Sequence, residues 1–353
     1  MTLTQQPAAP NAVRQSALAA NILASMGVPA RESFAVHAPD DAFEHGRVVA
    51  FNASQFTGNA PVEFLSHYAV RYQEAATGQG GLDDIRRFIA PDVNSNTSQF
   101  VEYALYNYTD SLLALDNAND DLRAIGADFP TLRNPPHQLV TQRIANRGIA
   151  LEVDEDEERL DGDWQQQKVA FLRGVLDRSR LRRTVALFVA GAVNVNRTWD
   201  ATSDPDSDLV EELEAQTLRA SRVVYGPGAW TKRRRALRGQ NTPAGYASAK
   251  MSLEELAGEF AVEEVQVVRA KYATGSASTG NIVGNQVLLF CAGEHLGRND
   301  FSNLKTFTAP TKTGQRYAVY LRQVGDKRWR IALECYETVA ITSTVGLEVI
   351  TVN

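Results

Sequence analysis

Cysteine is scarce and long apolar runs are absent in this chain of 353 residues. Its two cysteines, Cys291 and Cys335, are too few for a disulfide framework or a thiolate metal site, and their apolar surroundings predict core positions. No run approaches the about 18 apolar residues that a membrane-spanning helix needs, so we expect no membrane association. The first residues also lack the basic, then apolar, pattern of a secretion signal.

Recognisable catalytic and cofactor motifs are missing as well. The chain has no G-x-x-x-x-G-K-[ST] phosphate loop, GPG at 226–228 lacks the third glycine of a dinucleotide loop, and GSASTG at 275–280 is not a nucleophile elbow. The five histidines are not spaced as a metal-binding pair beside a carboxylate. We therefore expect no cofactor, no metal and no catalytic residues, although distant carboxylates could still converge in space.

Positive charge is scarce overall, because the formal net charge is −6, yet it is concentrated in one stretch. Five basic residues lie within two helical turns: Lys232, Arg233, Arg234, Arg235 and Arg238. At about 100° per residue, Trp230 and Leu237 share one helix face. Arg233 and Arg234 flank that face and can lay their stems on it while their charged ends stay in water. The other three point away, and we predict a subunit-interface role for Lys232, Arg235 and Arg238.

Three partners are open for these outward charges. The first is an acidic surface, for which the chain offers residues 152–163, where eight of twelve are acidic, and the segment Asp204–Glu214. The second is plain solvent, and the third is nucleic acid. An acidic protein does not hold DNA by bulk charge, so we favour salt bridges within or between subunits. Residues 152–163 themselves are predicted to be a solvated loop or a frayed helix end.

The N-terminal third predicts extensions rather than a compact unit. Spacing of Leu18, Ile22 and Met26 indicates a short amphipathic helix. The aromatic-rich stretches LSHYAVRYQ, from residue 65, and QFVEYALYNYTD, from residue 99, are typical of strands. The polar segment between them carries a small apolar island, so we predict a two-stranded ribbon with a long tip that needs a partner. The candidate contact residues of this island are Leu82, Ile85 and Phe88.

Two helices are predicted in the middle of the chain. The first covers HQLVTQRIANRGIALEV, residues 137–153, after a Pro-Pro entry. The second covers residues 164–190, with an expected break or kink near Ser179 where the apolar stripe changes register. The D-x-D-x-D cluster that starts at Asp204 lacks the Gly and Glu of a calcium loop and instead predicts a helix capped near residues 206–207.

Strands and helices alternate from Ser221 onward, which predicts a mixed α+β architecture. RVVYG is a strand, PGAW a turn and TKRRRALRG a helix. MSLEELAGEFAV is a second helix, with Ser252 as its N-cap and Glu255 completing a capping box. Strands follow in VEEVQVVRAKY, IVGNQVLLFCAG, the RYAVYLRQ and RWRIALEC hairpin, and the Val- and Thr-rich C-terminus.

This order of elements resembles the major capsid protein of tailed double-stranded-DNA bacteriophages, which has the Hong Kong 97-type fold. The pattern covers roughly residues 50–353 and is most specific in TWDATSDPDSDL, VVYGPGAW, SLEELAGEFAVEEVQVVRAKY and IVGNQVLLFCAG. The acidic insertion at 152–163 and the divergent first 50 residues depart from the family pattern. No lysine–asparagine cross-link of the kind some relatives make can be assigned.

The resemblance implies five divisions of the chain. They are an N-terminal arm at 1–50, an extended loop with flanking strands at 51–110, a peripheral domain with a long spine helix at 111–190, an axial domain at 191–322, and C-terminal strands returning to the peripheral domain at 323–353.

The resemblance also implies a structural role. Copies of the chain would form pentamers and hexamers of an icosahedral head in the virion, assembled in the bacterial cytoplasm. Scaffolding, portal and decoration proteins are possible partners, and double-stranded DNA would be enclosed without sequence-specific binding. The alternatives are an encapsulin-type nanocompartment shell and, from another class, a soluble α+β enzyme with a dispersed active site.

Overall fold

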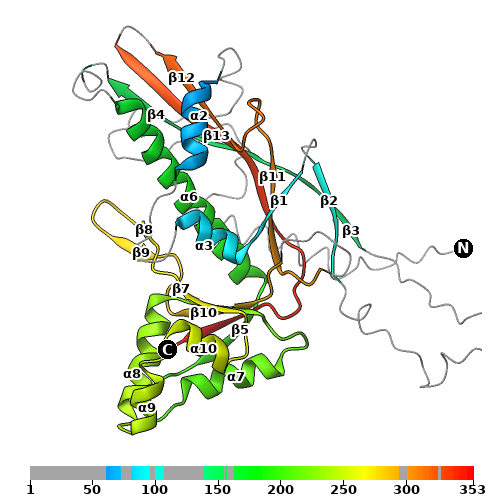
Figure 1. The fold of residues 1–353 in the computed structure, drawn as a ribbon, viewed down its shortest axis with the longest axis vertical. Helices are drawn as coiled ribbons and strands as arrows, with labels where there is room; N and C mark the ends of the chain where they lie inside the picture. The colour runs from blue at the N-terminus through cyan, green and yellow to red at the C-terminus, as the bar shows by residue number, and fades with distance from the viewer. Residues whose placement is uncertain are drawn as a thin grey trace, which may run out of the picture.

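The structure is a computed structural model, and it describes residues 61–72, 81–95, 100–106, 138–154, 156, 163–293, 300–324 and 327–353. The predicted N-terminal helix and most of the acidic segment 152–163 lie outside the described residues. Two five-stranded sheets and one long helix dominate the described part (Figure 1). The two cysteines are buried and unpaired, as predicted. None of the helices within the described ranges has the length and apolar character needed to cross a bilayer.

The first sheet is built around one long strand, β13 (Arg328–Ile341). The first half of β13 lies between β4 (Asn146–Asp154) and β12 (Tyr317–Gln323), both antiparallel to it. Its second half pairs with β11 (Leu304–Ala309), which pairs in turn with β1 (Asp92–Asn94). The predicted hairpin of β12 and β13 is confirmed, because alternating apolar residues on both strands bury one face.

The second sheet has the strand order β5-β14-β10-β6-β7. Its helical layer packs on one face through the core that contains Leu209, Ala229 and Leu256. The opposite face packs on the end of the long helix through Val185 and Phe188. The strands are β5 (Val193–Arg197), β6 (Arg222–Tyr225), β7 (Glu264–Val267), β10 (Gln286–Phe290) and β14 (Glu348–Val352), and the helices are α7 (Pro205–Ala215), α8 (Pro227–Gly239), α9 (Pro243–Ser248) and α10 (Leu253–Glu259). A hairpin of β8 (Lys271–Ala273) and β9 (Thr279–Asn281) projects beside them (Figure 1).

The long helix α6 (Trp164–Gly191) runs for 28 residues and serves both sheets. Val169, Leu172 and Leu176 enter the core of the first sheet. Further along, Val185 and Phe188 enter the core of the second sheet. The predicted break near Ser179 is wrong: the register of the apolar stripe changes because the helix moves from one core to the other, and the helix continues through that point.

Residues 65–73 do not form the predicted strand. They belong to helix α2 (Glu63–Arg71), which buries Leu65 and Ala69 against the first core. Spacing of four residues puts these two side chains on one face, and contact with α6 and β12 decides in favour of the helix over the local aromatic preference for strand.

The two-stranded ribbon exists, but its partners differ from the prediction. β2 (Phe100–Ala104) pairs with β3 (Leu139–Arg143). The predicted helix over 137–153 is therefore wrong, because these residues form β3 and β4. Nine residues of β4 pair with β13, a tertiary contact that the local pattern cannot reveal. One face of the ribbon packs on the first sheet, where the rings of Tyr103 and Phe307 lie 5.1 Å apart.

The sheets group the later strands differently from the predicted divisions. β11 and β12 lie within 191–322, yet they belong to the first sheet with β4 and β13. β14 lies within 323–353, yet it pairs with β5 and β10 of the second sheet. Chain order alone could not show this, because the backbone crosses between the sheets after Phe290 and again after Ile341.

Candidate functional site

Helix α8 carries the basic stretch and is anchored at its N-terminus by a close approach of two backbones. Pro227 occupies the first turn, where its missing N–H costs nothing, so the helix begins within PGAW and not after it. A Cβ on Gly226 would lie 2.1 Å from the carbonyl oxygen of Gly284, so no larger residue fits there. The GPG motif therefore has a packing role in this chain.

Arg233 is fully buried, contrary to the prediction that its charged end stays in water. Its Nε and Nη2 donate to the two carboxylate oxygens of Asp206 at 2.6 and 2.7 Å. Nη2 also donates to the Ser248 carbonyl at 3.1 Å, and the guanidinium lies 5.2 Å from the centre of the Trp230 ring. The expected salt bridge between the basic stretch and the Asp204–Glu214 segment thus forms inside one chain, through Arg233.

Lys232 also departs from the prediction that it points away from the fold. Its Nζ donates to the carbonyl of Val352 on β14 at 2.9 Å. Arg234 donates to the carbonyl of Ala249 at 3.2 Å. Both charges therefore help to seat α8 on its own domain, because they satisfy carbonyl groups at the end of a strand and of a helix.

Arg235 and Arg238 remain on the surface, as predicted. Both are exposed, and neither makes a hydrogen bond or ion pair with another residue in the part of the chain that the structure describes. Of the three outward residues proposed for an interface, these two keep a free charged end. The candidate surface on α8 is thus the face of Arg235 and Arg238.

Each aspartate of the D-x-D-x-D cluster has a structural role. Asp204 caps α7, accepting from the backbone N–H groups of Asp206 and Ser207 at 3.2 and 3.4 Å. Asp208 accepts from the indole N–H of Trp199 at 3.0 Å. The cap lies two residues earlier than predicted. Within the described ranges, no group of three or more His, Cys, Asp or Glu residues could hold a metal ion.

The apolar island proposed as a partner contact lies inside the chain. Leu82, Ile85 and Phe88 belong to α3 (Leu82–Ile89) and are 4%, 1% and 8% exposed in the core of the second sheet. Their spacing of three residues makes a buried helix stripe. These side chains are not available to a neighbouring subunit, which corrects the prediction.

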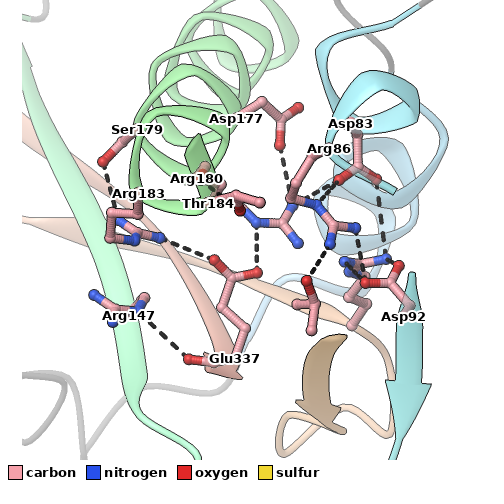
Figure 2. Close-up of polar contacts among 12 residues, drawn as sticks. Asp83, Arg86, Asp92, Arg147, Asp177, Ser179, Arg180, Arg183, Thr184 and Glu337 are labelled. Atoms are coloured by element: carbon pink, nitrogen blue, oxygen red, sulfur yellow. Dashed lines mark hydrogen bonds and ion pairs between the residues drawn. The ribbon is translucent and has the colours of Figure 1, made fainter. Parts of the chain in front are cut away.

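A buried network of arginines and carboxylates lies where α3 crosses α6 (Figure 2). At its centre, Asp83 of α3 accepts from Nε of Arg86 at 2.9 Å and lies 3.2 Å from Nη1 of Arg180 on α6. Arg180 also lies 3.1 Å from Asp177 and contacts Glu337 of β13 directly. The network joins the two helices to the first sheet.

Further arginines surround the same carboxylates. Arg173 pairs with Asp177 and lies 3.6 Å from Asp83. Arg316 of β12 donates to Asp92 at 2.6 and 3.1 Å, and Arg86 reaches Asp92 at 2.7 Å. These bidentate and shared contacts offset the desolvation of the buried charges.

The charges hold each other in the ionised state. Burial opposes ionisation of Asp83, but the guanidinium groups of Arg86, Arg180, Arg316 and Arg173 outweigh it and hold the pKa of Asp83 well below its usual range. The pKa of Glu337 is lowered in the same way. There, burial again acts in the opposite direction, and Arg180 provides the largest lowering.

The sequence interpretation missed this network, although a signal was present. Arg173, Asp177 and Arg180 stand at intervals of four and three residues along α6, so they share one helix face. That face borders the stripe of Leu172 and Leu176. Charged residues that follow an apolar stripe at helical spacing indicate buried ion pairs.

Two sheets bridged by one long helix, with a two-stranded ribbon alongside, define the Hong Kong 97-type capsid fold that the sequence pattern predicted. No family model matches the chain, and no curated protein matches it.

Among solved structures, a phage-related protein from Bordetella bronchiseptica superposes with a TM-score of 0.59 at 16% identity, covering 83% of this chain and 97% of that one. The capsid of cyanophage P-SCSP1u gives a TM-score of 0.45 at 9% identity, covering 93% and 96%. The holo-encapsulin complex from Synechococcus elongatus gives 0.43 at 11%, covering 86% and 96%. At these identities the likeness to the Bordetella protein shows a shared fold.

Proposed function

We propose that this protein is a phage major capsid protein, which assembles into pentamers and hexamers of a closed head around double-stranded DNA. The observation that carries the proposal is the fold, which extends over 83% of the chain in the superposition with the phage-related protein. The sequence pattern of tailed-phage capsid proteins supports it independently. The virion is the expected location, and scaffolding, portal and decoration proteins are candidate partners.

The β2–β3 ribbon supports a role that depends on contact with neighbouring subunits. Its inner face is covered by the first sheet, but Phe100 and Leu139 on the outer face are 56% and 61% exposed. Large apolar side chains on an exposed ribbon are costly in a free monomer and are typical of surfaces that become covered. We assign the role of the extended loop to this ribbon, in place of residues 65–105.

The two sheets suggest the domain division. The first sheet, with α2 and the start of α6, corresponds to the peripheral domain, and the second sheet, with α7–α10, corresponds to the axial domain. Residues 1–50 keep the role of an N-terminal arm in this proposal.

The decisive experiment is assembly of the purified chain, alone and with its candidate scaffolding partner, followed by light scattering and electron microscopy. Closed shells with nuclease-protected DNA in infected cells support a phage head, whereas shells without DNA or tails favour a nanocompartment. A stable monomer under every condition contradicts both. A small oligomer that turns over a substrate would favour the enzyme alternative.

The ribbon gives a matched test. Replacing Phe100 and Leu139 by serine should leave the free energy of unfolding of the free subunit within about 0.5 kcal/mol, because both side chains are exposed. The same double variant should assemble poorly. Serine at Tyr103, on the covered face, is the contrast: it should destabilise the subunit itself. Normal assembly of the Phe100 and Leu139 variant would remove the ribbon from the interface.

A further inference from the structure

Charge is segregated along the helical layer of the second sheet. Residues 231–238 of α8 contain five basic residues and no acidic one, whereas residues 252–268, over α10 and β7, contain five glutamates and no basic one. Mixed charge of both signs is the usual surface pattern of a monomer. Two segregated patches of opposite sign on one domain instead indicate complementary contact.

Part of each patch is already used within the chain. On the acidic side, Glu255 accepts from its own N-cap, Ser252, and Glu263 lies 3.6 Å from Arg222. Glu254 and Glu259 are exposed and form no ion pair with any residue that the structure describes. They are the acidic counterparts of Arg235 and Arg238.

The two patches lie on different parts of the sheet. Helix α10 packs on β7, the edge strand, whereas α8 packs on the interior strands β10 and β14. A contact between two different patches of identical subunits is heterologous, and such contacts close into rings when the rotation permits. The other acidic surface considered, Asp204–Glu214, is less suited, because its Asp206 is occupied by Arg233.

We propose that the α8 face of one copy, with Arg235 and Arg238, binds the acidic α10–β7 face of a second copy, with Glu254 and Glu259. The inference rests on the proposed shell function and names the contact that would orient neighbouring subunits. Exposed charges of this kind contribute little within a monomer, but across an interface they set partner and register.

The test exchanges the charges. One variant carries Arg235→Glu and Arg238→Glu, a second carries Glu254→Lys and Glu259→Lys, and a third carries all four. Arg235→Lys with Arg238→Lys is the matched control, because it keeps the charge. Circular dichroism and thermal unfolding of each free subunit establish that the fold is intact, and assembly is followed by light scattering against protein concentration.

Each charge-reversed pair should raise the protein concentration at half assembly by about tenfold or more, because like charges then face each other. The four-fold exchange should restore assembly towards the wild-type level, and the lysine control should match wild type. Added salt should weaken the wild type. Normal assembly of both pairs, or no recovery in the four-fold variant, overturns the proposal while leaving the shell function in place. Failure of the wild type to assemble overturns both.

Mixing provides a second readout that needs no four-fold variant. In a mixture of the two reversed pairs, an alternating ring has complementary charges at every contact. An even-numbered ring can alternate throughout, but a ring of five must contain one repulsive contact. Electron microscopy should therefore find hexamers recovered and pentamers depleted in the mixture. Equal recovery of both rings, or of neither, counts against the contact. If the arginine pair assembles normally but its shells hold less DNA, the face binds nucleic acid instead.

Discussion

Replacing Arg180 by methionine removes the central cation of the buried network and leaves its carboxylates behind. Arg180 is fully buried and contacts Asp83, Asp177 and Glu337. Removing one partner of a buried ion pair costs about 3–5 kcal/mol, because the remaining charge is neither solvated nor compensated. We expect a loss of that size in the free energy of unfolding of the free subunit at pH 7.

The effect should depend on pH with a definite sign. In the wild type the pKa of Glu337 lies below its ordinary value of 4.5, so its contribution is present above pH 4.5 and is lost only as the pH falls further towards the folded value. Without Arg180, burial dominates and raises the pKa of Glu337 above 4.5. The variant then takes up a proton in the folded state, so the difference from wild type should shrink as the pH falls from 7 towards 4.5.

Urea unfolding followed by tryptophan fluorescence, at several pH values, measures both effects. Arg182→Met is the matched control on the same helix, because Arg182 is exposed and only stacks 4.2 Å from the Tyr272 ring centre. It should cost about 1 kcal/mol or less. Combining Arg180→Met with Glu337→Gln should recover part of the loss. A loss under about 1 kcal/mol for Arg180→Met, or one that does not change with pH, would refute the reasoning.

Three further predictions concern single sites. Arg233→Met should lower the free energy of unfolding by about 2–4 kcal/mol in urea titrations, because it strands the carboxylate of Asp206; a loss equal to that of an exposed arginine would contradict the buried pair. Gly226→Ala should cost about 1–3 kcal/mol in thermal unfolding, since its Cβ would meet the Gly284 carbonyl at 2.1 Å, and an unchanged midpoint would show that the turn relaxes. Burial raises the pKa of the Cys335 thiol to about 12, so a thiol reagent at pH 8 should react there only after unfolding, and rapid labelling of the folded chain would contradict this.

Local signals were sufficient where an element carries its own instructions. The capping box of Ser252 and Glu255 is formed as predicted, and α6 follows its apolar stripe over nearly the predicted length. Strand β4 and helix α2 were missed for the opposite reason. Gly148 lies in β4 because β13 pairs with it, and Leu65 lies in a helix because α6 covers it, and neither partner is adjacent in the sequence.

The candidate surface was predictable only to the extent that a single helix can be judged alone. The helical period placed Arg235 and Arg238 outward correctly. It could not show that Asp206 would draw Arg233 inside, or that the carbonyl of Val352 would come within reach of Lys232. Those outcomes depend on which elements pack beside α8, which is a tertiary property.

The continuity of α6 has a mechanical consequence. Twenty-eight residues at 1.5 Å each make a rod about 42 Å long, with an end embedded in each core. Bending such a rod requires its backbone hydrogen bonds to stretch on one side, so a displacement applied to one sheet is transmitted to the other with little loss. Compliance must then lie elsewhere, in elements that pack on only one side. The β8–β9 hairpin and the β2–β3 ribbon, which both stand beside the rod in Figure 1, are the parts of the described chain free to yield when neighbouring copies change their angle.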